Sequence, residues 1–283
     1  MAIKSVQQIM LGTVCTSEEA ALEVLRRIKH AGYDALELNS FMTHPTPALV
    51  RMLTKAAGMP TGSCGRLDWK SLLKESGLAV SAYHTDLGSL ERESDKVHAE
   101  AKAFGTDRLV ITGMYRFEYG DEQTVKDLAA RLNTAGAKAK ENGLRLFYHN
   151  HNAELLRTDS GEYAYSILLR ETDPESVSFE FDSYWFADAG ASPLVWMETL
   201  GERMKLWHIA DRGTRRGKTP MTPILKSDSV ELGTGNLPLT QLRNQAVKNG
   251  IECVVLESHR NWIDKDPVKS LERSAVWLNR NFE

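Results

Sequence analysis

Short runs rich in β-branched and aromatic residues alternate along this chain with longer amphipathic stretches. Strands that alternate with helices of about 10 to 15 residues are typical of parallel βαβ units. Eight such units favour closure into a (β/α)8 TIM barrel, an α/β fold. The expected strands cover residues 8–14, 35–39, 79–85, 108–112, 145–149, 178–182, 205–209 and 252–257.

The stretch 17–30 shows how each helix is expected to begin and end. Thr16 or Ser17 can cap its N-terminus, and the two glutamates that follow suit the helix dipole. Apolar residues then recur with the helical period. Gly32 ends the helix, because glycine readily adopts the left-handed turn found there. Glycines shortly before later strands repeat this signal: Gly77, Gly105, Gly143 and Gly250.

The length of 283 residues suits one barrel of this kind, since an ordinary one needs about 250 residues. We therefore expect residues 1–283 to form a single domain. An open, doubly wound sheet is the alternative fold. Such a sheet normally carries a glycine-rich phosphate turn after its first strand, and Leu11-Gly12-Thr13-Val14 is not such a turn.

Charge and composition argue against several classes of protein. Apolar residues make up 42% of the chain, the net charge is −3 and the pI is about 6.3. A duplex-DNA binder would carry a basic face, although Arg212, Arg215, Arg216 and Lys218 form a local basic patch. We expect no nucleic-acid partner.

The three cysteines, Cys15, Cys64 and Cys253, are odd in number and far apart. This spacing predicts free thiols in a reducing compartment. The first eight residues lack an apolar core of signal-peptide length. The chain also has no run of about 18 apolar residues. These features predict a cytoplasmic protein with no membrane partner.

Two long connections interrupt the rhythm, 42–69 and 211–235. Long loops in compact domains are often lids or binding loops. Both connections follow a strand, and barrel enzymes place their sites on this C-terminal face. Gly233-Thr234-Gly235 can bind phosphate through backbone amides or form a plain turn before a helix at 237–248.

Polar side chains gather where the expected strands end. Four of them, from consecutive strands, suit one divalent cation: His149, Asp182, His208 and Glu257. Mixed imidazole and carboxylate ligands favour Mn, Zn, Co or Fe over Mg or Ca. Such an ion can polarise a substrate carbonyl and stabilise an enediolate.

Neighbouring strand-end residues are expected to complete the site. The catalytic candidates are Glu257, His151, Glu154 and His84, and the substrate-binding candidates are Glu37, Trp185 and Arg212. Two alternatives stay open. His149 and His151 share one face of a strand, so either can be the metal ligand. Asp182 can also serve only as the cap of the following helix.

Several motifs carry a resemblance to a known family. They are Tyr148-His149-Asn150-His151 with Glu154, Phe181-Asp182-Ser183-Tyr184-Trp185 with Gly190, Trp207-His208-Ile209-Ala210-Asp211, Leu232-Gly233-Thr234-Gly235-Asn236, and Val255-Leu256-Glu257. Over about residues 14–277 the chain resembles the xylose isomerase-like barrels, often called sugar phosphate isomerases/epimerases. That superfamily includes ketose 3-epimerases, hydroxypyruvate isomerases, inosose dehydratases and zinc endonucleases of the endonuclease IV type.

The resemblance implies a metal held by Asp182, His208, Glu257 and a residue of the fifth strand. In the 3-epimerases that residue is a glutamate, which also acts as one of two acid/base groups on opposite substrate faces. Here His149 stands at that position, and a metal-bound imidazole nitrogen cannot also accept a proton. Many relatives also have a lysine where this chain has Ala210.

We therefore expect a metal-dependent isomerase or epimerase that abstracts a proton next to a carbonyl of a sugar, keto-sugar or cyclitol. A dehydratase of the inosose dehydratase type needs fewer acid/base groups and is the alternative. A non-catalytic sugar-binding relative would fit the fifth-strand histidine, whereas the net charge disfavours a DNA-repair nuclease. The expected partner is a small carbohydrate, and the sequence leaves the oligomeric state open, a homo-oligomer included.

Overall fold

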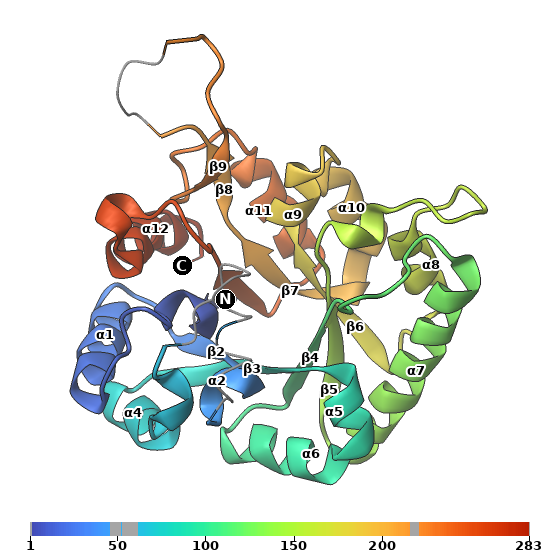
Figure 1. The fold of residues 1–283 in the computed structure, drawn as a ribbon, viewed down its shortest axis with the longest axis horizontal. Coiled ribbons are helices and arrows are strands. Elements are labelled where there is room, and N and C mark those ends of the chain that lie inside the picture. Colours follow the sequence, from blue (N-terminus) through green and yellow to red (C-terminus); the bar gives the residue numbers. More distant parts are fainter. Residues whose placement is uncertain (1, 46–51, 53–61, 216–220, 283) are drawn as a thin grey trace. The chain divides into compact units, whose positions relative to one another are not determined.

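Parallel strands organise the chain in the computed structural model, which describes residues 2–45, 52, 62–215 and 221–282 (Figure 1). The strands are β1 (Ile3–Gln7), β2 (Ala35–Asn39), β3 (Ala79–Thr85), β4 (Arg108–Thr112), β5 (Arg145–His149), β6 (Val177–Asp182), β7 (Met204–Ile209), β8 (Asp211–Gly213), β9 (Asp228–Val230) and β10 (Cys253–Leu256). In the described ranges, eight of these strands form a closed barrel in the order β1-β10-β7-β6-β5-β4-β3-β2. The predicted (β/α)8 fold is confirmed.

The strand predictions hold from β2 onward. The bounds of β2, β3, β4 and β5 are those expected, β6 and β7 each begin one residue earlier, and β10 is one residue shorter at each end. These strands are mostly or wholly buried. Buried β-branched and aromatic runs are the strongest signal for a parallel strand.

The prediction of a first strand at residues 8–14 is wrong. The strand is β1, and Gln8–Leu11 form a 3-10 helix whose side chains are all buried. Gln7 ends the strand, and its side-chain oxygen accepts the backbone N–H of Ile9 at 3.1 Å. This bond turns the chain, so the apolar residues that follow are buried in a helical turn.

The chain forms two compact units, which we describe separately. The first contains Met1–Ala79, His208–Asn244 and Glu252–Glu283, and the second contains Val80–Trp207 and Gln245–Ile251. Within the first unit β1 pairs with both β2 and β10. Its helices are α1 (Glu18–His30), α2 (Ser40–Thr43), α4 (Trp69–Ser76) and α12 (Pro267–Asn281), with 3-10 turns at Cys64–Arg66 and Ile263–Lys265.

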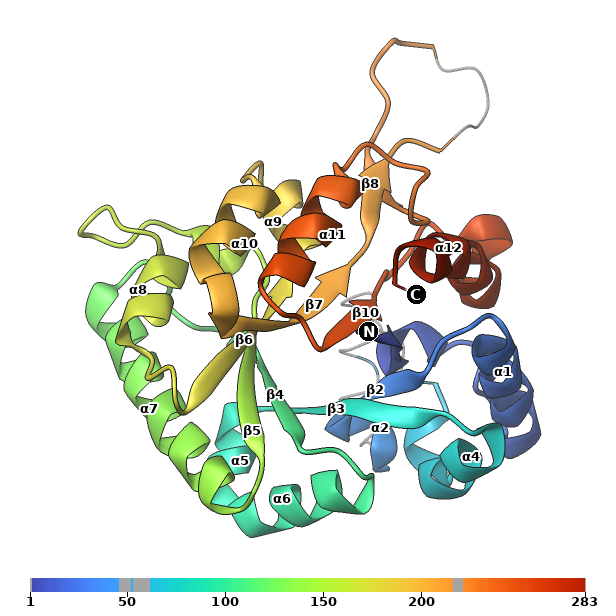
Figure 2. The ribbon, with the colours of Figure 1, turned by 180° about the vertical axis from the view of Figure 1, so that it is seen from behind.

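Helix α1 of the first unit packs beside α4 and α12 (Figure 2). Ser17 caps it, since the Ser17 hydroxyl accepts the backbone N–H of Ala20. Gly77 ends α4 in the left-handed conformation, with φ of 70°, and its N–H donates to the carbonyl of Leu73. The predicted glycine stops have positive φ throughout: Gly32, Gly77, Gly105, Gly143 and Gly250.

In the second unit β3, β4, β5 and β6 pair in parallel register. The helices are α5 (Leu87–Arg92), α6 (Ser94–Ala103), α7 (Glu122–Glu141), α8 (Ala164–Glu171), α9 (Ser183–Asp188) and α10 (Pro193–Leu200), with 3-10 turns at Ala153–Leu155 and Gly201–Arg203. Helix α7 packs against β5 and beside α8 (Figure 1). Both β7 and α11 (Leu239–Lys248) cross the boundary between the units.

The two long connections differ in what they contain. Within 211–235, which we expected to form a long loop, β8 and β9 pair antiparallel. Residues 46–51 and 53–61 of the other connection lie outside the described residues, as do Arg216 and Lys218.

The predicted free thiols are confirmed, because Cys15, Cys64 and Cys253 are buried and carry no disulfide. In the described part of the chain, no helix combines the length and apolar character needed to cross a bilayer.

Candidate active site

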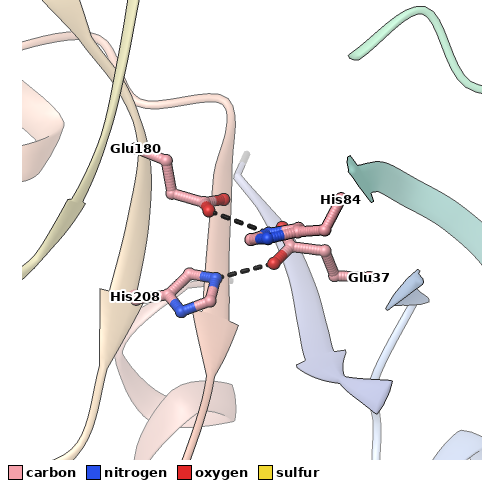
Figure 3. Close-up of side chains that lie close together, drawn as sticks. All are labelled: Glu37, His84, Glu180 and His208. Atoms are coloured by element: carbon pink, nitrogen blue, oxygen red, sulfur yellow. Dashed lines mark hydrogen bonds and ion pairs between the residues drawn. The ribbon is translucent and has the colours of Figure 1, made fainter. Parts of the chain in front are cut away.

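In the first unit, one imidazole lies between two carboxylates. His208, near the end of β7, has Nδ1 2.8 Å from Glu257 Oε2 and Nε2 2.7 Å from Glu37 Oε1. The His208 ring and Glu37 are buried, and the Glu257 side chain is 11% exposed. Figure 3 shows the contact between His208 and Glu37. Two carboxylates around one ring favour a positive charge on the ring or beside it.

Amide side chains at the ends of β1 and β2 hold Glu37 in place. Gln7 Nε2 donates to Glu37 Oε1 at 2.9 Å. Asn39 Nδ2 donates to Gln7 Oε1, and the Asn39 backbone N–H donates to Gln8 Oε1 at 2.8 Å. We did not predict Gln7 or Gln8 as site residues, because the first strand was predicted at 8–14, several residues after its actual position.

In the second unit, one carboxylate lies between two imidazoles. Glu180 Oε2 is 3.1 Å from His149 Nδ1 and 3.1 Å from His84 Nε2. His84 Nδ1 is 3.2 Å from the hydroxyl of Thr112. The ring of His84 beside Glu180 is visible in Figure 3. His84, His149 and Glu180 are all buried, so each polar atom depends on such partners.

Asp182 lies two residues beyond Glu180 on β6, so both side chains share one face of the strand. Its Oδ1 accepts the backbone N–H of Trp185 at 3.0 Å and so caps α9. Asn150 Oδ1 accepts the backbone N–H of Asp182. The cap uses one carboxylate oxygen, and a carboxylate has a second oxygen that can bind a cation at the same time.

Glu154 is completely buried in a network of tyrosines. Its Oε1 accepts from Tyr148 at 2.7 Å and from Tyr119 at 3.3 Å, and its Oε2 accepts the backbone N–H of His151 at 3.0 Å. Burial raises the pKa of Glu154 above its usual range, although the bonds from Tyr148, His151 and Tyr119 act in the opposite direction. The network fixes the backbone at His151.

The His151 ring lies near two other rings. Its centroid is 5.1 Å from that of the His149 ring and 5.9 Å from that of the Trp185 ring. Both His151 and Trp185 are half-buried. A side chain of this kind can reach a bound ligand while its neighbours hold it in place.

A sequence model described as a xylose isomerase-like TIM barrel matches residues 25–281 of this chain. The chain belongs to the xylose isomerase-like TIM barrel family. Among the curated proteins, an inosose dehydratase of Mesomycoplasma hyopneumoniae (strain J) is 31% identical over 140 residues. That match covers 48% of this chain and 39% of the relative, so the chain spans about two fifths of the relative's length.

Solved structures of other proteins share the barrel fold of this chain. A sugar phosphate isomerase/epimerase from Parabacteroides distasonis has a TM-score of 0.74 at 23% identity, over 98% of this chain and 94% of that chain. The IOLI protein with a bound zinc atom has a TM-score of 0.66 at 15% identity, over 99% of both chains.

In this xylose isomerase-like barrel the glycine turn after β9 is already occupied by a carboxylate. Asp211 Oδ2 accepts the N–H groups of Gly233 and Gly235 at 3.0 and 2.9 Å, and Oδ1 accepts that of Leu237 at 3.1 Å. The amides considered as phosphate donors therefore donate to Asp211. The alternative of a plain turn fits these contacts.

The remaining predicted substrate contacts differ in burial. Glu37 is fully buried and contacts Gln7 and His208. Arg212 lies in β8 and is half-buried. The neighbouring Arg215 donates to Glu231 at 2.9 Å. Substrate binding by Glu37, Trp185 and Arg212 stays a prediction.

Proposed function

We propose that this chain is a divalent-metal-dependent enzyme that abstracts a proton next to a carbonyl of a keto-cyclitol or keto-sugar and eliminates water. The observation that carries the proposal is the contact between His208 Nδ1 and Glu257 Oε2 at the strand ends. An ion bound to His208 Nδ1 and Glu257 would replace this contact, while Glu37 accepts from His208 Nε2 and orients the ring, as carboxylates do behind metal-binding histidines.

The proposed metal ligands are His149, Asp182, His208 and Glu257. Each is of a residue type that can offer one ligand atom. Their strands or strand ends, β5, β6, β7 and β10, are consecutive in the barrel order, and parallel barrel strands end on one face. Two imidazoles and two carboxylates suit Mn, Zn, Co or Fe. The likeness of the fold to the zinc-bound IOLI protein is consistent with this assignment.

A bound divalent ion would polarise a substrate carbonyl and stabilise an enediolate. Of the two carboxylates that contact His208, Glu37 is buried and Glu257 is partly exposed. We therefore assign the proton abstraction to Glu257. His151 and Trp185 are half-buried in the second unit. We assign them contacts with substrate hydroxyl groups, with His151 as the proton donor to the departing hydroxyl.

We assign His84 and Glu154 supporting roles in place of proton transfer. Both ring nitrogens of His84 contact protein groups, Glu180 and Thr112. Both oxygens of Glu154 likewise accept from protein donors. With these groups engaged, Glu257 is the carboxylate that we assign as base, whereas epimerisation with two carboxylates needs a second one on the opposite substrate face. This favours elimination over epimerisation. The inosose dehydratase similarity supports the same choice.

Isomerisation or epimerisation is the second candidate, supported by membership of a family that includes sugar isomerases and epimerases. Elimination and epimerisation can be told apart by their products, since epimerisation exchanges a carbon-bound proton without loss of water.

A panel of inososes and keto-sugars, incubated with Mn²⁺ in D₂O and followed by NMR, tests the proposal. We expect an unsaturated or diketone product from at least one compound. Glu257→Gln should lower the rate by about 10²- to 10⁴-fold. Deuterium uptake without water loss would favour epimerisation, and neither product nor exchange across the panel would favour a sugar-binding protein.

A further inference from the structure

The buried carboxylate of Glu180 lies in the second unit, beside a proposed metal ligand. Strands β5 and β6 pair in a register that sets His149 opposite Glu180. Glu180 is completely buried. A buried carboxylate is costly unless it is paired and hydrogen-bonded, so its surroundings indicate its role.

Hydrogen bonds link four residues from four consecutive strands. Glu180 Oε2 lies 3.1 Å from His149 Nδ1 and 3.1 Å from His84 Nε2, and His84 Nδ1 lies 3.2 Å from the Thr112 hydroxyl. The β4–β5 register in turn sets Thr112 opposite His149. His149 therefore lies between Thr112 and Glu180 in the strand register.

The donor and acceptor roles in this network follow once Glu180 is taken as an ionised carboxylate. An ionised carboxylate can only accept, so each imidazole must donate an N–H to it. His84 then donates from Nε2 and accepts from the Thr112 hydroxyl at Nδ1. His149 donates from Nδ1, which makes Nε2 the nitrogen that carries the lone pair. Carboxylates that accept from the second nitrogen of a histidine orient the ring towards a metal.

We propose that Glu180 is a positioning residue that fixes His149 in the Nδ1–H tautomer and thereby selects Nε2 as the metal-binding nitrogen. His84 and Thr112 act through Glu180 by holding its carboxylate. The inference rests on the proposed function for the role of the ion. The tautomer of His149 can be measured on the metal-free chain.

The first experiment is ¹⁵N NMR of the histidine side chains in the full metal-free chain, with His149 assigned through His149→Asn. We expect the Nδ1–H tautomer of His149 in the natural sequence and its loss in Glu180→Gln. An Nε2–H tautomer in the natural sequence would overturn the inference, whatever the protein's activity.

The second experiment measures Co²⁺ affinity and the visible Co²⁺ spectrum. Glu180→Gln should weaken binding by about 10- to 100-fold and alter the spectrum. Its metal-free thermal midpoint should fall only modestly, because the Gln oxygen can still accept from an imidazole although the charge is lost. Thr112→Val, a milder change, should weaken binding less and serves if Glu180→Gln does not fold.

The control is Glu231→Gln, which alters another buried carboxylate of the chain, one bonded to Arg215 and Ser270. It should bind Co²⁺ as the natural chain does. Unchanged affinity and spectrum in Glu180→Gln would overturn this inference alone. Failure of the natural chain to bind Co²⁺, Mn²⁺ or Zn²⁺ would overturn the proposed function as well.

Discussion

Glu154 is an acid near the site whose pKa the fold raises. It is completely buried, and burial raises its pKa above the ordinary 4.5 despite bonds from Tyr148, His151 and Tyr119. A raised pKa means that the folded chain holds this proton more tightly than the unfolded chain does. The contribution of Glu154 to stability therefore falls as the pH rises from its ordinary pKa through its folded pKa.

Replacing Glu154 by Gln should remove this pH dependence. We expect the stability of Glu154→Gln relative to the natural chain to increase as the pH rises from the ordinary pKa of 4.5 through the folded pKa. Urea midpoints of both chains across that range provide the measurement. A difference that stays constant or shrinks as the pH rises would contradict the prediction.

Glu231→Gln is a control with the opposite sign. Burial raises the pKa of Glu231, but the bonds from Arg215 and Ser270 outweigh burial and lower it overall. Its contribution to stability is present above the ordinary pKa and is lost as the pH falls. The relative stability of Glu231→Gln should therefore decrease as the pH rises.

Gly113 provides the space for the Glu154 network. A Cβ atom at this position would lie 2.5 Å from Glu154 Oε1 and 3.3 Å from both His151 Nδ1 and the Tyr119 hydroxyl. Gly113→Ala should destabilise the chain by about 1 to 3 kcal/mol through overpacking, as measured by urea unfolding. In Gly88→Ala the added Cβ meets mainly the Arg92 side chain, so that control should change stability little.

At the scale of elements, Asp211 holds the turn at residues 233–237 through hydrogen bonds. Its carboxylate accepts backbone N–H groups from Arg212, Gly233, Gly235 and Leu237. Asp211→Ala should cost roughly 2 to 4 kcal/mol, since these donors lose a charged acceptor. Hydrogen exchange at the amides of Gly233 and Gly235 should accelerate. Unchanged exchange there would show that the carboxylate does not hold the turn.

The strand predictions were correct where the buried strand residues are also apolar or aromatic. They failed where a buried strand contains polar residues. The buried runs of β3 and β5 are apolar or aromatic enough to be recognised. In contrast β1 contains Lys4, Ser5 and Gln7, and the more apolar 8–11 forms a 3-10 helix. Ser5 and Gln7 are buried because they bond to Ala35 and Glu37 of β2. Such partners cannot be identified before the register is known.

At the scale of the whole molecule, the alternation of strands and helices predicted the barrel, and the strand ends predicted the residue types of the candidate site. The supporting contacts were not predictable. The pairing of Glu180 with His149 and His84, or of Glu154 with Tyr119, depends on strand register and on loops that bring distant residues together. The sequence shows which groups are present, whereas only the fold shows which of them are already engaged.

Metal binding should stabilise the folded chain as a whole. A ligand at 100 times its dissociation constant adds about 2.7 kcal/mol to the free energy of unfolding if it binds only the folded state. We expect Mn²⁺ or Zn²⁺ to raise the unfolding midpoint of the natural chain. The same ions should have a much smaller effect on His208→Ala.

The most direct test of the proposed metal site is metal analysis of the untagged full chain, compared with Asp182→Asn. Asn can still cap α9, so this change keeps the observed bond to Trp185 and removes the charge. We expect about one Mn²⁺ or Zn²⁺ per natural chain at roughly micromolar free metal, and little in Asp182→Asn at an unchanged metal-free thermal midpoint. A natural chain that binds no divalent ion, or an Asp182→Asn chain that binds it equally well, would contradict the proposed site.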